Sequence, residues 1–257
     1  MMQEVRLQFS QTDNYRKREA FKTLRSNIEF CGEDMKVITV TSCTPNEGKS
    51  SVAMEIAKAF AEAGNKTMLI DADMRKSVLV GRYKTGAIKM GLTHCLIGKA
   101  TYLDVACNTN IPNLFITFSG PVPPNPSELL GGSRFASILS GLRKTFDYVI
   151  IDTPPLGSVI DAAVCAKQCD GTVLVVESNA VSYKFVQKVK EQLDMAGSRI
   201  LGVVLNKVDM DGKGHYGQYG KYYGKYYGKY GEENGGIMNS VIDKEEIDKI
   251  DDIEEIE

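Results

Sequence analysis

The chain has 257 residues and a formal net charge of −2, with 43% hydrophobic and 25% charged residues. This composition is typical of a globular protein of one large or two small domains. A near-neutral charge gives no basic field for nucleic acid, so we expect no nucleic-acid partner. No apolar run approaches the roughly 20 residues that span a bilayer, and the first ten residues lack a signal-peptide core. Six scattered cysteines without a CxxC pair predict reduced thiols in a cytoplasmic protein.

The first predicted element is a helix over residues 13–31, where Phe21, Leu24 and Ile28 recur at helical spacing. After it, apolar strands rich in β-branched residues alternate with helices. The predicted strands are 36–42, 67–71, 114–118, 148–152, 172–177 and 200–206, and the predicted helices are about 48–63, 127–144, 159–168 and 181–196. This alternation predicts an α/β fold with a mostly parallel central sheet flanked by helices on both faces.

The stretch SCTPNEGKSS, residues 42–51, joins a buried strand to a helix and predicts a P-loop NTPase. Backbone N–H groups at such a helix start form a cradle for phosphate. Gly48 lets the backbone approach, Lys49 reaches the β- and γ-phosphates, and the Ser50 hydroxyl ligates Mg²⁺. Cys43 departs from the GxxxxGK[ST] pattern, and the alternative is a chance GKS at a helix start. The predicted contacts of the nucleotide here are Asn46, Glu47, Gly48, Lys49, Ser50 and Ser51.

Two further strands end in aspartate, in MLIDADMR (68–75) and VIIDTPP (149–155). Ligands of open α/β sheets lie at the carboxyl ends of the strands, so Asp71, Asp73 and Asp152 are expected to converge near the metal of the nucleotide. Carboxylates there hold the ion or accept a proton from an attacking hydroxyl. The alternative is that each aspartate only caps the next helix.

Together, the GKS, DxDxR and DxxP motifs and the tyrosines that follow resemble the bacterial tyrosine kinases of capsule and exopolysaccharide synthesis. The resemblance extends over most of residues 15–231. It implies an ATP- and Mg²⁺-dependent protein-tyrosine kinase whose catalytic residues are Asp71, Lys49 and Asp73, with Asp71 as the base. It also implies that Ser50, Asp73 and Asp152 hold the metal. Arg75 completes the second motif, and GPVPPNPSELL (120–130) also resembles the family; neither has an assigned role.

After residue 207 the apolar pattern stops, and the unit YGKY occurs three times in tandem. The tyrosines there have only Gly, Lys, Gln and His around them, so packing is a poor explanation. We expect a flexible tail that brings many phenols to one active site, largely that of another subunit. The predicted phosphorylation sites are Tyr216, Tyr219, Tyr222, Tyr223, Tyr226, Tyr227 and Tyr230. The alternatives are a tyrosine-rich segment that drives condensation and a stacking platform for single-stranded nucleic acid.

Four parts are therefore predicted: an N-terminal segment with an interface helix (1–35), a P-loop kinase domain (36–210), a tyrosine-rich cluster (211–236) and an acidic tail (237–257). In the first part, the resemblance suggests that Glu19, Lys22 and Arg25 form an E-x-x-R-x-x-R motif that closes a ring of subunits. Lys22 replaces the middle arginine and lacks its planar fork. The alternative is a solvated charged face.

The resemblance further implies protein substrates and a transmembrane activator of the polysaccharide co-polymerase type, which recruits the kinase to the inner face of the membrane. Two other functions compete. LNKVD (205–209) also matches the guanine-binding signature of GTPases, although in the kinase family Asn206 lies near adenine. A ParA/MinD-like positioning ATPase shares the fold, but Thr44 stands where its extra lysine is expected, and the acidic C-terminus is unsuited to anionic lipid.

Overall fold

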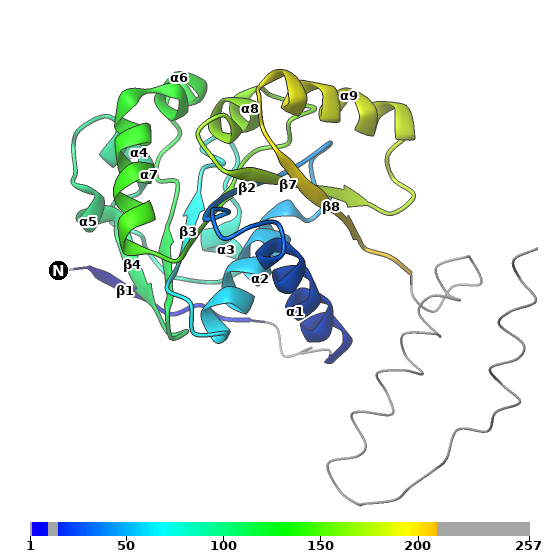
Figure 1. The fold of residues 1–257 in the computed structure, drawn as a ribbon. Coiled ribbons are helices and arrows are strands. Elements are labelled where there is room, and N and C mark those ends of the chain that lie inside the picture. Colours follow the sequence, from blue (N-terminus) through cyan, green and yellow to red (C-terminus); the bar gives the residue numbers. More distant parts are fainter. Residues whose placement is uncertain (1, 10–14, 210–257) are drawn as a thin grey trace, which may run out of the picture. The chain divides into compact units, whose positions relative to one another are not determined.

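The computed structural model describes residues 2–9 and 15–209 (Figure 1). The predicted tyrosine cluster and acidic tail lie outside these residues, so neither is tested. Six of the strands are where the apolar runs predicted them, within one residue at each end. The strands are β1 (Gln3–Val5), β2 (Val37–Ser42), β3 (Thr67–Asp71), β4 (Ala106–Thr109), β5 (Leu114–Thr117), β6 (Tyr148–Asp152), β7 (Gly171–Glu177) and β8 (Ile200–Asn206).

These strands form one sheet in the order β1-β4-β5-β3-β6-β2-β7-β8. Every pairing is parallel except that of β4 with β5, which is antiparallel. The mostly parallel α/β fold is therefore confirmed. β1 (QEV) and β4 (ACNT) were not predicted, because neither contains a run of apolar residues.

The described helices flank this sheet. They are α1 (Tyr15–Glu29), α2 (Lys49–Glu62), α3 (Leu79–Arg82), α4 (Leu92–Leu96), α5 (Tyr102–Val105), α6 (Pro126–Gly131), α7 (Ser133–Thr145), α8 (Asp161–Ala166) and α9 (Tyr183–Met195). The prediction of a single helix over 127–144 is wrong, because the segment forms two helices, α6 and α7. The segment is split at Gly132, which has an extended backbone, because adjacent glycines at 131 and 132 weaken helix propagation.

The two faces of the sheet have separate cores, which explains why its central strands are apolar throughout. In β3, Leu69 packs into the core beneath α1 and α2, whereas Met68 and Ile70 pack into the core beneath α7. Successive side chains of a strand point to opposite faces, so a strand covered on both faces buries every position. Figure 1 shows α1 and α2 on one side of the sheet and α8 and α9 on the other.

Candidate active site

A pocket of about 600 Å³ lies at the carboxyl ends of the parallel strands, where the motifs predicted it. Its walls come from the P-loop, the segments after β3 and β6, the end of β8 and the start of α1. The lining residues are Lys17, Pro45, Asn46, Gly48, Lys49, Ser50, Ser51, Asp73, Arg75, Lys76, Val78, Arg82, Pro154, Pro155, Ser158, Val159, Asn206 and Lys207.

The P-loop is built around Gly48, the residue before α2. Its φ of 91° is in the left-handed region, and a Cβ there would lie 2.2 Å from Nδ2 of Asn206, so only glycine fits. Glu47, predicted as a nucleotide contact, is 1% exposed and does not line the pocket. Its carboxylate accepts hydrogen bonds from the backbone N–H groups of Thr44 (2.6 Å) and Glu177 (3.2 Å). The side chain of Glu47 therefore shapes the loop.

The end of β8 braces the same loop. Asn206 donates from Nδ2 to the carbonyl oxygen of Glu47 at 2.8 Å, and Lys207 donates from Nζ to the carbonyl oxygen of Asn46, also at 2.8 Å. Lys207 Nζ also contacts the Glu177 carboxylate at 2.8 Å. Asn206 lines the pocket as predicted, and its bond to the loop uses one of the two N–H donors of its amide. The roles of Lys207 and Glu177 were not predicted, although LNKVD contains the lysine.

The predicted lysine and aspartates come together. Asp71 and Asp152 are direct register partners on the neighbouring strands β3 and β6. Lys49 Nζ lies 3.0 Å from Oδ2 of Asp73, 3.9 Å from Oδ1 of Asp152 and 3.2 Å from Oγ of Ser50. Burial opposes the charge on Lys49, yet Asp152 and Asp73 raise its pKa above the usual value. Four residues from three separate motifs therefore form one charged cluster.

Asp71 is the most deeply placed of the three aspartates. It is fully buried and does not line the pocket, its Oδ2 accepts a hydrogen bond from Ser77 Oγ, and its Oδ1 has no hydrogen-bond partner. Burial, reinforced by the charge of Asp152, raises the pKa of Asp71 to about 7. Burial likewise raises the pKa of Asp152 to about 6. A carboxyl that titrates near neutrality suits proton transfer. Nothing in the motif pointed to Ser77.

Most of the charged residues that line the pocket are cationic. Of the residues that line the pocket, six are Lys or Arg and one is Asp. Arg82 donates a hydrogen bond to Ser51, and Lys17 of α1 pairs with Glu55 of α2. A cleft of one charge sign concentrates ligands of the opposite sign, so the pocket favours a polyanion such as a nucleotide triphosphate.

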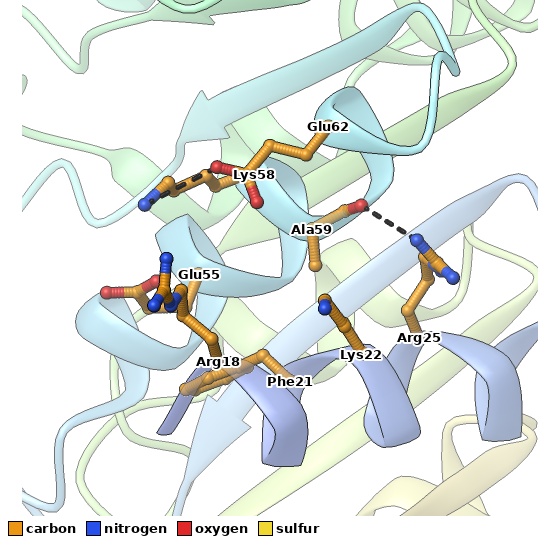
Figure 2. A pocket seen from close by; sticks show the side chains of 8 residues that line it. All are labelled: Arg18, Phe21, Lys22, Arg25, Glu55, Lys58, Ala59 and Glu62. Carbon is orange, nitrogen blue, oxygen red and sulfur yellow. Dashed lines mark hydrogen bonds and ion pairs between the residues drawn. The ribbon is translucent and has the colours of Figure 1, made fainter. Parts of the chain in front are cut away.

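The predicted interface residues lie on α1, beside α2. Lys22 is paired with Glu19 at 2.7 Å. Arg25 donates to the carbonyl oxygen of Ala59 at 3.3 Å, as Figure 2 shows. Phe21 packs against the core as the amphipathic pattern predicted. A groove of about 90 Å³ separates the side chains of the two helices. It is lined by Arg18, Phe21, Lys22, Arg25, Glu55, Lys58, Ala59 and Glu62.

Among the described residues, no helix combines the length and apolar character needed to cross a bilayer. Within the same ranges, no three or more His, Cys, Asp or Glu side chains are grouped so that they could hold a metal ion by themselves. All six cysteines are free thiols.

Comparison with known proteins decides between the kinase and its alternatives. A family model described as an AAA domain matches residues 35–201. Tyrosine-protein kinase CpsD of Streptococcus agalactiae is 46% identical over 205 residues, which are 79% of this chain and 89% of that protein. This chain is a member of the bacterial tyrosine-protein kinase family. The kinase is also similar to the crystal structure of the chimerical protein CapA2B2, with 36% identity, a TM-score of 0.72 and coverage of 80% of this chain and 94% of that one.

The positioning-ATPase alternative is related to this kinase by fold alone. The septum site-determining protein MinD of Pyrococcus horikoshii, complexed with Mg-ADP, is 22% identical with a TM-score of 0.59, covering 72% of this chain and 76% of that one. The predicted P-loop fold and the predicted enzyme class, a protein-tyrosine kinase, are thus confirmed. The P-loop fold and the kinase relatives also imply that the chain binds a nucleotide.

Proposed function

We propose that this tyrosine kinase transfers the γ-phosphoryl group of ATP to tyrosines of its own C-terminal cluster, and that it thereby regulates capsular or exopolysaccharide synthesis and export. The observation that carries the proposal is the cluster of Lys49 with Asp71, Asp73 and Asp152 beside a cationic pocket. The link to polysaccharide rests on the family resemblance.

The residues present fit ATP with Mg²⁺. Gly48, in the left-handed region, precedes the N-terminus of α2, whose backbone N–H groups suit phosphate. Asp152 Oδ1 is buried without a hydrogen-bond partner, which leaves it available to a cation. Mg²⁺ is commonly held by one or two carboxylates together with substrate phosphates, so Ser50, Asp73 and Asp152 would suffice here. Bound Mg²⁺ would neutralise phosphate charge and orient the triphosphate.

The transfer requires one nucleophile and one base. The phenolic oxygen of a tyrosine forms a bond to the γ-phosphorus, the bond from that phosphorus to the β–γ bridging oxygen breaks, and ADP leaves. Asp71 accepts the phenolic proton on Oδ1, the oxygen that has no hydrogen-bond partner; because this oxygen is buried, substrate binding must first open a path to it. Lys49 moves from the carboxylates to the β- and γ-phosphates, where its positive charge stabilises the negative charge that develops on the leaving ADP.

The last strand of the domain ends at the edge of this site. β8 ends at Asn206, and Asn206 and Lys207 both line the pocket, so the chain leaves the domain at the edge of the active site. Tyr216 follows nine residues after Lys207, a reach of at most about 30 Å. A tethered tail in an assembly of subunits meets neighbouring sites at an effective concentration of roughly millimolar. The proposed acceptors are the seven tyrosines from Tyr216 to Tyr230.

Assembly and recruitment complete the proposal. Lys22 and Arg25 of α1 line the groove of Figure 2, and Glu19 pairs with Lys22; we infer that this face joins subunits into a homo-oligomer. By family resemblance, a transmembrane activator of the polysaccharide co-polymerase type stimulates the kinase at the inner face of the membrane. Other protein substrates are expected as well.

Incubation of the purified full-length chain with Mg²⁺ and either ATP or GTP, followed by mass spectrometry, tests the proposal. Phosphate on the tail tyrosines with ATP is expected, and Lys49→Met serves as the inactive control. Nucleotide turnover without phosphotyrosine would favour the positioning ATPase, and strict selectivity for GTP would favour the GTPase. Either result overturns the proposal.

A further inference from the structure

Arg75 and the proline-rich segment 120–130 have no part in the reaction above, yet the structure joins them. Asp161, at the start of α8, accepts from Arg75 Nε at 2.6 Å and from Arg75 Nη2 at 3.0 Å. Ser127, within the proline-rich segment at the start of α6, donates to the same carboxylate and lies 3.4 Å from Arg75 Nη2. Two segments that are distant from Arg75 in the sequence therefore hold its guanidinium in place.

The two ends of this ion pair differ in their surroundings. Asp161 is fully buried and does not line the pocket, whereas the Arg75 side chain is 41% exposed and does. A carboxylate that is buried behind a guanidinium holds it in place, because two parallel hydrogen bonds set both its position and its plane. Arg75 has five donors, and the described contacts of Asp161 and Ser127 use Nε and Nη2. These contacts do not use the two donors of Nη1, which are therefore available to a ligand in the pocket.

The order of the strands shows which end of the pocket Arg75 occupies. In the sheet order β3-β6-β2-β7-β8, Asn206 ends β8, the P-loop follows β2 and Arg75 follows β3. Neighbouring strands are about 4.8 Å apart, so β3 lies about 10 Å from the P-loop strand β2, on the side away from β8 and Asn206. Arg75 therefore follows the strand that ends in Asp71, the proposed base, and the acceptor tyrosine must approach the site on this side.

We propose that Arg75, held by Asp161 and Ser127, is an acceptor-side residue that binds the phosphotyrosyl group formed on the tail. Phosphotyrosine carries about −1.5 to −2 charges and three acceptor oxygens, which match the free edge of a guanidinium. Lys76 adds a second cation to the same wall. The unmodified tail carries lysines and no phosphate, so the site distinguishes product from substrate by charge. This inference rests on the proposed function.

A binding measurement tests this site without requiring turnover. The full-length chain with its seven tail tyrosines changed to phenylalanine is loaded with ADP and titrated into a fluorescein-labelled peptide of residues 216–231. The peptide is compared with and without phosphate on Tyr222, by fluorescence anisotropy. The phosphopeptide is expected to bind at least about tenfold more tightly. Arg75→Ala should abolish the difference, and Asp161→Asn and Ser127→Ala should each reduce it several-fold.

A matched ion pair elsewhere provides the control. Arg143 Nη1 contacts both oxygens of Asp170, at 2.7 and 2.6 Å, and neither residue lines the pocket. Arg143→Ala and Asp170→Asn should leave the preference for the phosphopeptide unchanged. If Asp161→Asn does not fold, Ser127→Ala and Arg75→Lys still test the positioning, and Arg75→Lys should retain only part of the preference.

Two results would overturn the inference: equal affinity for both peptides, or an unchanged preference in Arg75→Ala. Parallel labelling of the wild-type chain with ATP separates this failure from failure of the proposed function. A labelled tail without preference for the phosphopeptide refutes the acceptor-side role alone. An unlabelled tail refutes the proposed function.

Discussion

Lys49 Nζ lies 3.0 Å from Oδ2 of Asp73, so the P-loop cation and a strand-end carboxylate are in direct contact. The same lysine must neutralise the triphosphate during transfer. Lys49→Met is therefore expected to lower the rate of tail phosphorylation by at least about a hundredfold, the range seen when one charge-stabilising group is lost. The rate is measured by quantitative mass spectrometry, with thermal unfolding as the control for folding. A rate within tenfold of wild type would contradict the role assigned to Lys49.

Alanine variants of Gly48 and Gly64, which have similar φ angles, distinguish the effect of backbone strain from an effect on nucleotide binding. Gly48 has a φ of 91° and Gly64 a φ of 94°, but an added Cβ meets Asn206 Nδ2 at 2.2 Å only at Gly48, while nothing lies within 4 Å at Gly64. Gly48→Ala and Gly64→Ala should each destabilise the fold by about 1 kcal/mol through backbone strain, and Gly48→Ala by more, because the Asn206 side chain must also shift. Only Gly48→Ala should weaken nucleotide affinity, by at least about tenfold in a titration with fluorescent ADP. Equal affinities in the two variants would contradict a P-loop shaped around Gly48.

The buried Asp71 makes stability depend on pH. Its pKa rises on folding from the usual 3.8 to about 7, so between these values the folded chain binds more protons than the unfolded one. The free energy of unfolding of the nucleotide-free kinase should therefore decrease as pH rises from about 4 to 7, with no further contribution from Asp71 above that range. Asp71→Asn should show a shallower decrease in urea unfolding at a series of pH values. If the free energy of unfolding of the variant changes with pH as steeply as that of the wild type, Asp71 is not the source of the pH dependence.

The face of α1 that carries Glu19, Lys22 and Arg25 is the proposed interface between subunits. Lys22 is 59% exposed in its side chain, so substitutions there should change the free energy of unfolding by less than about 0.5 kcal/mol. Lys22→Arg supplies the planar fork for bidentate pairing and should shift the equilibrium toward the oligomer, whereas Lys22→Glu should shift it toward the monomer. Sedimentation velocity over a range of concentrations measures both. If the two variants assemble alike, this face is not the subunit interface.

The sequence predicted the fold through its apolar strands and the cluster through three local motifs. Lys49, Asp73 and Asp152 meet because each follows a parallel strand whose carboxyl end lies at the same edge of the sheet. This placement depends on topology alone, so it can be inferred from order and spacing.

Contacts between distant segments could not be predicted in this way. The pairing of Arg75 with Asp161, 86 residues away, has no periodic or motif signal. Glu47 lies within the predicted motif, yet its side chain supports the loop because the backbone N–H groups of Thr44 and Glu177 happen to face it. Such roles depend on side-chain direction, which spacing does not determine.

In the proposed function, the active site of one subunit phosphorylates the tail of another. The most direct test mixes two full-length chains: Lys49→Met with an intact tail, and a chain with Lys49 intact whose seven tail tyrosines are phenylalanine. After incubation with ATP and Mg²⁺, we predict phosphate on Tyr216–Tyr230 of the Lys49→Met chain, identified by mass spectrometry. If that tail stays unmodified under conditions in which the wild-type chain labels itself, transfer between subunits is refuted.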